Sequence, residues 1–521
     1  MHIVTTDEMR QLEIRADSEY GLTSPILMEH AGKSAAEILA QHIRRQQSIN
    51  EREFLILVGP GNNGGDGKVM GRYLHQWGGA VSYYEWKEQR LTIKEQEVPP
   101  HETAAKLDEC FSRAHYILDA LLGTGRSRPL PDSMRNLLAR ARQERERREN
   151  ARVVAIDLPT GMNADTGEVD PGTIPSDMTI TLACPKQGFF FFPARSYIGE
   201  LYVGDIGLPP ALEEGLQTEM LTSALVKRLL PDRPLESNKG TFGKVMLYCG
   251  SPPYPGSAYL AGSAAGRAGA GLVTLAVTEL MLPIYASSLH ETTFLLLPNE
   301  RAESYELATT LVNSLEGYRV LLIGPGLGQS SYTREVILQA LEQVRALPEQ
   351  KRPRLIIDAD GLNNLSALER WWMLLPPETI ITPHPGEMGR LCGGLKVSGG
   401  GIDRLPLARE RASEWQVTLV LKGACTIIAA PGGRARINWQ ANPALATAGT
   451  GDVLAGLTAG LLAQQVASGE TISAFDAASA AVYLHTAAAE LVSTDIGHAG
   501  LLASDLLPKI PMAIMKCLLK P

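Results

Sequence analysis

The chain has 521 residues, too many for one hydrophobic core, so we expect two or more domains. Its 44% hydrophobic and 20% charged residues are ordinary for a globular protein, and its net charge of -8 argues against a nucleic-acid partner. No apolar run is long enough to span a membrane, and the charged amino terminus has no signal-peptide core. The six cysteines lack C-x-x-C spacing, which predicts neither a disulfide framework nor a zinc site and favours the cytoplasm.

In the first half, apolar strands alternate with helical segments, as in a parallel sheet. Two helices are predicted over residues 7–20 and 24–41, ahead of a strand at 54–58 that is apolar on both faces. That strand leads into the glycine-rich segment 59–67, expected to be a loop before a helix at 68–76. The order is typical of dinucleotide-binding folds, although the spacing is not G-x-G-x-x-G. Further strands are predicted at 81–86, 116–122, 153–158 and 178–183.

Three oxygen-bearing side chains, Asn63, Asp119 and Thr160, lie at or just after the ends of predicted strands. Ligands of open parallel sheets bind beyond the carboxyl ends of the strands, so these three loops should converge. A set without imidazole or thiolate suits a hard cation rather than a transition metal. The residues alone leave open whether a cation binds here.

A break rich in proline and glycine separates the two halves. We place the boundary near residues 211–235, between a domain at 1–215 and another at 225–521. The second half opens with a strand at 245–248 and a helix at 257–269 whose small residues predict close packing by another element. Later strand ends, which are expected to face one cleft, carry Gly326, Asp358, His384, Lys422 and Asp452.

The segment Gly449–Asp452 (GTGD) precedes an apolar, helix-forming run. Its glycines let backbone N–H groups form a cup for an anion, and the helix dipole adds to it, so phosphate is the expected guest. Asp452 is then either the N-cap of the helix or an acid or base that faces a hydroxyl of a second substrate. Taken alone, His384 fits a turn histidine and Lys422 a surface cation. Together, a base, a cation and a phosphate cup suggest chemistry like phosphoryl transfer.

Motifs along nearly the whole chain resemble those of a known family. The first half, with GPGNNGGDG, LDALLGTG and IDLPTG, resembles the NAD(P)H-hydrate epimerases. The second half, with GPGLG, DADGLN, TPHPGEMGRL, KGACT and ATAGTGDVLAG, is similar to the ADP-dependent NAD(P)H-hydrate dehydratases, relatives of ribokinase-like kinases. In this order the halves resemble the bacterial bifunctional NAD(P)H-hydrate repair enzymes. The implied fold is α/β, with an N-terminal Rossmann-like three-layer domain and a C-terminal ribokinase-like α/β domain.

The resemblance implies repair of reduced nicotinamide cofactors that have gained water at C6 of the ring. The epimerase half would interconvert the R and S hydrates of NADH and NADPH (NADHX and NADPHX). The dehydratase half would remove water from the S form, driven by conversion of ADP to AMP. Potassium at the first site and magnesium on the nucleotide are the implied cations, and a homo-oligomer is expected by base rate.

The resemblance also implies the residues of the first site. Asp157 would sit at the reacting ring as a catalytic residue, and Asn63, Asp119 and Thr160 would bind potassium. The family often has serine at position 160, and threonine keeps the oxygen. Contacts to the hydrate would come from Asn62, Asn63, Gly64, Gly65, Asp66, Gly123, Thr124, Gly125, Arg126, Ser127, Arg128, Pro129 and Asp157.

In the second site, Asp452 would take the proton of the C6 hydroxyl as the β-phosphoryl group of ADP is transferred to it. The hydrate would be contacted by Gly326, His384, Pro385, Gly386, Glu387, Met388, Gly389, Arg390 and Asp452. The adenine nucleotide would be bound by Lys422, Gly423, Ala424, Cys425, Thr426, Thr447, Ala448, Gly449, Thr450 and Gly451.

Two other functions fit parts of the same pattern. A ribokinase-like kinase of a vitamin precursor would prefer ATP and release a phosphorylated product. Alternatively, the first half would be a binding module without catalysis, although a pure scaffold has no need of Asn63, Asp119 and Asp157. The sequence leaves open the choice between ADP and ATP, and between the hydrates of NADH and NADPH.

Overall fold

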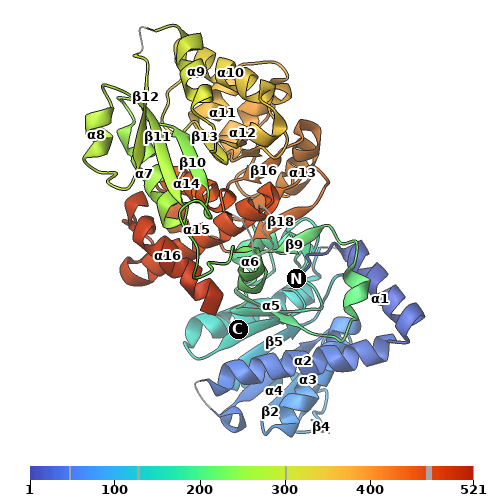
Figure 1. Ribbon diagram of the computed structural model, residues 1–521. Coiled ribbons are helices and arrows are strands. Elements are labelled where there is room, and N and C mark those ends of the chain that lie inside the picture. Colours follow the sequence, from blue (N-terminus) through green and yellow to red (C-terminus); the bar gives the residue numbers. More distant parts are fainter. Residues whose placement is uncertain (46–47, 126–128, 300–301, 465–471, 520–521) are drawn as a thin grey trace. The chain divides into compact units, whose positions relative to one another are not determined.

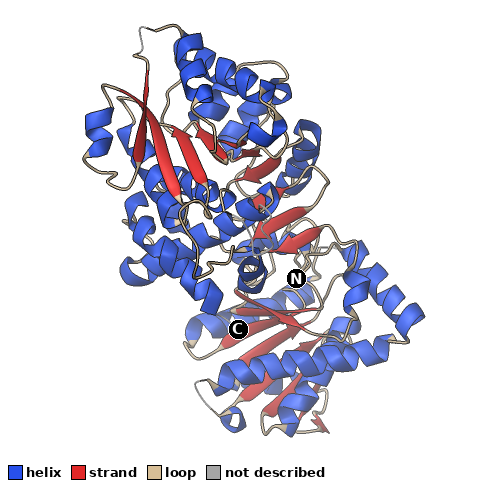
Figure 2. Ribbon diagram, viewed as in Figure 1, coloured by secondary structure: helices blue, strands red, loops and turns tan. Residues whose placement is uncertain are grey.

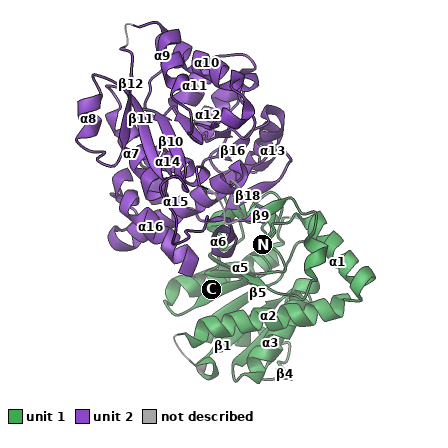
Figure 3. Ribbon diagram, viewed as in Figure 1, with its two compact units in different colours: residues 1–218 green, residues 219–521 purple. Residues whose placement is uncertain are grey.

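The computed structural model describes residues 1–45, 48–125, 129–299, 302–464 and 472–519. The chain divides into two compact units, Met1–Thr218 and Glu219–Pro521 (Figure 3). Each unit is built of strands and helices in alternation (Figures 1 and 2). Within the described ranges, no helix is both long enough and apolar enough to cross a membrane.

The sheet of the first unit contains β1 (Glu53–Val58), β2 (Ala80–Glu85), β3 (Arg90–Ile93), β4 (Gln96–Glu97), β5 (Tyr116–Ala120), β6 (Arg152–Ile156), β7 (Met178–Leu182) and β8 (Glu200–Gly204). The strand order is β4-β3-β2-β1-β5-β6-β7-β8. Neighbouring strands from β2 to β8 are parallel, while β3 and β4 add an antiparallel edge. Because β2 and β5 flank β1 on opposite sides, the chain leaves β1 at the switch point where such sheets bind ligands.

The helices of the first unit are α1 (Thr6–Tyr20), α2 (Ser24–Arg44), α3 (Asn62–Gln76), α4 (Thr103–Arg113) and α5 (Asp132–Arg147). Alternate residues of β1 face opposite cores. Phe54, Ile56 and Val58 pack with α1, α2 and α3, whereas Leu55 and Leu57 pack with α4 and α5. The result is a helix–sheet–helix sandwich, which confirms the Rossmann-like three-layer fold expected for this half.

The glycine-rich segment after β1 differs from the expected loop. The helix α3 begins at Asn62, so residues 62–67 form its first turns, and the prediction of a loop up to residue 67 was wrong. A Cβ on Gly64 would lie 2.0 Å from the carbonyl oxygen of Gly59, and one on Gly67 would lie 2.5 Å from the Cβ of Ala120. Glycine content suggested a loop, but here glycine lets a helix approach the strands closely.

The sheet of the second unit contains β9 (Thr218–Met220), β10 (Lys244–Tyr248), β11 (Leu272–Thr278), β12 (Thr293–Leu297), β13 (Val320–Ile323), β14 (Arg354–Ile357), β15 (Ile380–Ile381), β16 (Thr418–Leu421), β17 (Thr426–Ala429) and β18 (Ala435–Asn438). The strand order is β12-β11-β10-β13-β14-β15-β16-β17-β18-β9. The strands from β12 to β16 are parallel, and β17 and β18 continue the sheet antiparallel. Strands β17 and β18 form a hairpin whose turn includes residues 431–433.

The helices of the second unit are α6 (Ser223–Leu229), α7 (Pro255–Arg267), α8 (Leu282–Ala286), α9 (Ser304–Asn313), α10 (Ser331–Ala346), α11 (Asp360–Leu365), α12 (Pro385–Leu391), α13 (Arg404–Trp415), α14 (Thr450–Leu462), α15 (Ala474–Ile496) and α16 (Ala503–Leu519). The main core lies between one face of the sheet and α6, α7, α14, α15 and α16. Helices α9 to α13 cover the other face (Figure 1).

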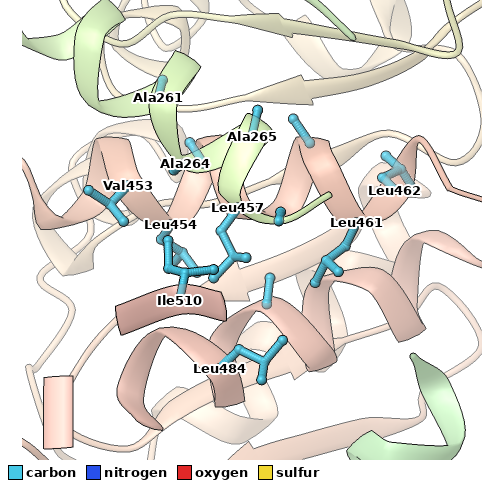
Figure 4. Close-up of a cluster of buried hydrophobic side chains, with 14 of the residues drawn as sticks. Ala261, Ala264, Ala265, Val453, Leu454, Leu457, Leu461, Leu462, Leu484 and Ile510 are labelled. Atoms are coloured by element: carbon cyan, nitrogen blue, oxygen red, sulfur yellow. The ribbon is translucent and has the colours of Figure 1, made fainter. Parts of the chain in front are cut away.

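Small residues bring α7 and α14 together at the centre of this core (Figure 4). A Cβ on Gly456 would lie 2.1 Å from the carbonyl oxygen of Ala261, and one on Gly460 would lie 2.4 Å from that of Ala265. The close packing predicted for the small-residue helix is therefore confirmed, and its partner is the helix that follows the GTGD segment. This packing fixes the position of the start of α14 relative to the sheet.

Candidate active sites

A cavity of about 640 Å³ lies at the carboxyl ends of the strands in the first unit. Its wall includes residues 60–63 after β1, residues 121–125 after β5, and side chains of α1. Among the predicted hydrate contacts, the cavity brings together Asn62, Asn63, Asp66, Gly123, Thr124, Gly125 and Asp157.

Of the remaining predicted contacts of the first site, the described ones are not part of the cavity wall. Gly64 packs on the backbone of Gly59, and a Cβ on Gly65 would lie 2.5 Å from the Cε of Met28, so these two glycines serve helix packing. Pro129 is not part of the cavity wall. Arg126, Ser127 and Arg128 lie outside the described residues.

Asp157 follows β6 in a left-handed backbone conformation, with a φ of 63°, which is strained for a residue other than glycine. Its Oδ1 accepts a hydrogen bond of 2.5 Å from the ammonium group of Lys186. The lysine also donates to the hydroxyl of Thr181 and to the carbonyls of Leu182 and Cys184. Because Lys186 is only 1% exposed, the ion pair is buried, and either partner alone would leave a costly unpaired charge.

Two further carboxyl groups, Asp66 and Glu13, line the same cavity. Burial, together with the nearby carboxyls of Asp157 and Glu13, raises the pKa of Asp66 to about 8. Burial also raises the pKa of Glu13, although Lys186 opposes it. The cavity therefore combines a carboxyl that holds its proton at neutral pH with one that is ion-paired, the arrangement that lets one site donate and accept protons.

Asn63, Asp119 and Thr160 converge around the backbone of Leu122. The amide of Asn63 donates to the carbonyl of Leu122 at 3.0 Å, and the N–H of Leu122 donates to the hydroxyl of Thr160 at 3.0 Å. That hydroxyl donates to Asp119 Oδ1 at 2.7 Å. Burial raises the pKa of Asp119, while its hydrogen bonds from Thr160 lower it. Within the described residues, the buried Oδ1 of Asn63 has no partner, so the group offers a free oxygen beside a carboxylate and a hydroxyl.

In the second unit, charged side chains gather where β14 and β16 end. The ammonium of Lys422 donates to Asp358 Oδ1 at 2.8 Å and lies 3.8 Å from Glu387 Oε2. Burial opposes the charge of the lysine, but Asp358 and Glu387 outweigh it and raise the pKa of Lys422. The hydroxyl of Thr382 donates to the same oxygen of Asp358 at 2.7 Å. The lysine is therefore a half-buried partner of buried carboxylates rather than a free surface cation.

Asp452 lies in the first turn of α14 but does not cap it. The N-cap is Gly449, with a φ of 89°, and Asp452 is the third residue of the helix, so the capping interpretation was wrong. Burial and the nearby Asp358 raise the pKa of Asp452 to about 6, against a hydrogen bond from Ser257 and the charge of Lys422. A carboxylate with this pKa is ionised at neutral pH and basic enough to accept a proton.

Gly326 adjoins the same residues. It has a φ of 67°, and a Cβ there would lie 2.8 Å from the Cβ of Ser257. His384 has the structural role of an N-cap for α12, because its Nδ1 accepts hydrogen bonds from the N–H groups of Gly386 and Glu387. The side chain of Glu387 in turn accepts from the N–H of His384 at 2.8 Å. Thus the 384–390 segment is placed beside Lys422 through Glu387.

The two predicted nucleotide segments meet at this cluster. Residues 422–426 span the turn from β16 to the first residue of β17, and residues 447–451 include the start of α14. A Cβ on Gly451 would lie 3.5 Å from the Nζ of Lys422. The hydroxyls of Thr447 and Thr450 donate to backbone carbonyls of their own loop. An anion here would therefore be bound through backbone N–H groups and Lys422.

Sequence reasoning missed four side chains that shape these sites: the buried Lys186, Arg404 and His485, and Glu13, which lines the first cavity. Lys186 follows β7, so the reasoning that placed Asp157 at the carboxyl end of a strand could also have identified Lys186. Glu13 is one acid among several on α1, and Arg404 and His485 are single polar residues in helices. Burial lowers the pKa of His485 to about 4, so this histidine behind Thr450 is neutral.

Each of the two units matches a family of known proteins. Residues 245–512, more than half of the chain, match the family model of NAD(P)H-hydrate dehydratase, and residues 24–188 match that of the YjeF-related protein N-terminus. The bifunctional NAD(P)H-hydrate repair enzyme of Moorella thermoacetica is 35% identical over 99% of this chain and 97% of its own. The bifunctional NAD(P)H-hydrate repair enzyme of Escherichia coli K12 is 33% identical over 96% of this chain and 91% of its own. An ADP/ATP-dependent NAD(P)H-hydrate dehydratase from Bacillus subtilis, crystallised with ATP and Mg2+, is 31% identical over 57% of this chain and 98% of its own, with a TM-score of 0.47.

Two α/β units, each with a buried cluster of charged side chains at the carboxyl ends of its strands, define an enzyme with two separate sites. The chain belongs to the family of bifunctional NAD(P)H-hydrate repair enzymes, with an epimerase unit followed by a ribokinase-like dehydratase unit. The resemblance inferred from the motifs is thereby confirmed.

Proposed function

We propose that this chain restores hydrated NADH and NADPH in two reactions. The first unit interconverts the R and S hydrates, and the second dehydrates the S form at the expense of ADP, releasing AMP and phosphate. The observation that carries the proposal is one cluster of charged side chains in each unit: Asp157 with Lys186 in the first, and Asp452 with Asp358 and Lys422 in the second. A vitamin-precursor kinase would have no use for the first cluster.

Epimerisation requires bond breaking at C6, which carries both the hydroxyl and the ring nitrogen. The nitrogen lone pair expels the hydroxyl as water when an acid protonates it, and water then adds to the other face while a base takes its proton. In the cavity, Asp66 holds the proton that is donated, and Asp157 is the carboxylate that accepts one. Water returns the proton from one carboxyl to the other, so the reaction consumes nothing.

Asn63, Asp119 and Thr160 would hold a potassium ion. The unpartnered Oδ1 of Asn63, the carboxylate of Asp119 and the hydroxyl of Thr160 are hard oxygen donors and fit such an ion. When bound, potassium supplies a fixed positive charge and orders the loops that carry its ligands. Since Asn63 also lines the cavity, that charge would help to bind an anionic hydrate.

Magnesium would enter the second site with the nucleotide. Over the described residues, no group of three or more His, Cys, Asp or Glu side chains is arranged to hold a metal. Magnesium that keeps its waters and binds mainly to phosphates needs no such group. Its chemistry there is to neutralise phosphate charge.

Dehydration is proposed to proceed through a phosphorylated hydrate. Asp452 takes the proton of the C6 hydroxyl, and the hydroxyl oxygen attacks the β-phosphorus of ADP, so that AMP leaves. The phosphate ester is a better leaving group than hydroxide, so the nitrogen lone pair then breaks the C6–O bond and releases phosphate. Loss of the C5 proton re-forms the ring double bond. Lys422 and the N–H groups at the start of α14 bind the phosphates.

The test uses purified full-length protein with a mixture of R and S NADH hydrate, ADP, magnesium and potassium. Return of the reduced-nicotinamide absorbance is followed, and AMP and phosphate are quantified. Complete recovery, faster than spontaneous epimerisation and with one AMP per NADH formed, is expected. A stable phosphorylated product with ATP would instead indicate a kinase.

The Asp157→Asn variant separates the two reactions. It keeps the second site intact, so recovery should stop at the S fraction and continue only at the spontaneous rate of epimerisation. Complete and fast recovery by this variant would remove Asp157 from the proposed mechanism.

A further inference from the structure

Arg404, the first residue of α13, is buried completely, with 0% of its surface exposed. Its guanidinium donates from Nη1 to the carbonyl of Cys425 at 3.1 Å. From Nη2 it donates to the carbonyls of Leu421 and Lys422, each at 3.0 Å. One side chain therefore ties together the end of β16, the turn after it and the residue before β17.

The same guanidinium explains the glycine in this turn. A Cβ on Gly423 would lie 2.5 Å from Nη2 and 2.9 Å from Cζ of Arg404. Any larger residue would push the guanidinium away from its carbonyl partners. Gly423 is thus required by the packing of a cation beneath the turn.

The charge of Arg404 has no carboxylate partner. Within the part of the chain that the structure describes, no Asp or Glu oxygen lies within 4.0 Å of it, in contrast to the buried Arg436, which pairs with Glu219 and Asp476. Burial accordingly lowers the pKa of Arg404, although Cys425 and Asp403 oppose this. Neutral carbonyls compensate a buried cation only in part, so an anion on the other side of the turn would complete the balance.

We propose that Arg404 is a positioning residue for nucleotide binding: it holds the 422–426 turn in its binding conformation and adds positive potential where the phosphates of ADP lie. Because the role presupposes that ADP binds at this turn, it rests on the function proposed above. Arg404 itself touches only protein, so its effect reaches the nucleotide through the backbone of the turn and the placement of Lys422.

The test compares Arg404→Met, Arg404→Lys and the control Arg436→Met in the full-length chain. Charged hydrogen bonds of this kind support changes of about 10-fold or more in affinity. We expect KM and the calorimetric Kd for ADP to rise by about 10-fold or more in Arg404→Met, with little change in KM for the hydrate. Arg404→Lys should recover part of the loss, since lysine restores the charge but not the forked contacts. The unfolding transition of the second unit reports whether that unit has folded in each variant, and the epimerase rate of the same chain is the control for the first unit.

Arg436 is another buried arginine of the same unit, and it pairs with Glu219 and Asp476 rather than with the turn, so its loss should lower stability and leave ADP affinity unchanged. If Arg404→Met does not fold, Gly423→Ala tests the same contact with a single added methyl group, and it should weaken ADP binding too. Unchanged ADP affinity in whichever of Arg404→Met and Gly423→Ala folds, or equal weakening by Arg436→Met, would overturn the inference. If the wild-type chain itself binds no ADP, the proposed function has failed before any variant is compared.

Discussion

At the scale of single residues, the proposed dehydration depends most on Asp452. Asparagine keeps the size of the side chain and removes the base, so Asp452→Asn should bind ADP and lose at least ~100-fold in kcat. Steady-state dehydration rates and ADP calorimetry on one preparation would measure both. The epimerase activity of the same chain should be unchanged. Full dehydratase activity in the variant would rule out this role.

The raised pKa of Asp452 also predicts a pH dependence. Its pKa is raised to about 6 by burial and by Asp358, and only the deprotonated form accepts a proton. Dehydration should therefore be constant above pH ~7 and fall by about tenfold per unit as the pH drops below 6. An aspartate at its ordinary pKa would keep its activity down to pH ~4. The measurement is kcat against pH at saturating ADP. A flat profile between pH 7 and 5 would contradict the role of Asp452 as the base.

The buried pair of Lys186 and Asp157 predicts a large cost when only one partner is removed. Lys186→Met leaves the carboxylate buried without a counter-charge, so the free energy of unfolding of the first unit should fall by about 3–5 kcal/mol. Adding Asp157→Asn to this variant should restore part of the loss, because no charge is then stranded. Denaturant unfolding of the single and double variants would measure the loss and its recovery. No recovery in the double variant would mean that Lys186 acts through its carbonyl contacts instead.

The residues that sequence reasoning located are those that follow strand ends, where the fold class alone determines the meeting point. Asn63 lies in the first turn of α3, Asp119 at the end of β5 and Thr160 after β6, yet a parallel sheet brings them to one edge. Glu13 and Arg404 were not located, because the place of Glu13 in the cavity wall and the burial of Arg404 depend on how a helix docks against distant segments. A single sequence shows an acid or a base in an amphipathic helix without showing which face is covered.

At the scale of elements, the contact between α7 and α14 sets the position of the phosphate-binding helix. Gly456→Ala would place a methyl carbon 2.1 Å from the backbone oxygen of Ala261, which has little freedom to move. The helices must separate, and we expect a loss of about 1–3 kcal/mol in stability. The exposed Gly266 of α7 is a matched control, since nothing lies within 4 Å of its Cβ position.

Gly266→Ala should raise stability by roughly 0.5–1 kcal/mol, because alanine favours helix more than glycine does. Thermal unfolding of the two variants would give shifts of opposite sign. If both alanines raised the stability, the close approach of α7 and α14 would not be the reason for the glycine at 456.

The starts of elements were less predictable than their existence. The sequence indicated strand, glycine-rich segment and helix after residue 53, but α3 begins at Asn62 and α14 at Thr450, both earlier than expected. At the start of α3, glycine was taken as a loop residue, whereas Gly64 lets the helix approach the backbone of Gly59 closely. At the start of α14, Gly449 is the N-cap in a left-handed conformation, with a φ of 89°. The shift matters for chemistry, because it moves Asp452 from the cap into the first turn.

At the scale of the whole molecule, each unit has a core of its own. The buried clusters of the first unit draw on residues between Val4 and Leu212, and the main core of the second on residues between Leu221 and Cys517. Each activity is therefore a built-in control for variants of the other unit. The same separation predicts how the chain unfolds when nucleotide is present.

A calorimetric scan should show two transitions, of which ADP with magnesium raises only one. A ligand at 100 times its Kd stabilises the unit that binds it by about 2.7 kcal/mol, or roughly 5 °C for a unit of this size. Gly456→Ala should lower the temperature of that same transition, and Lys186→Met should lower the temperature of the other. The two variants therefore assign each transition to its unit in the intact chain. If ADP raised both transitions equally, the free energy of binding would be shared between the cores, and the two sites would be coupled rather than independent.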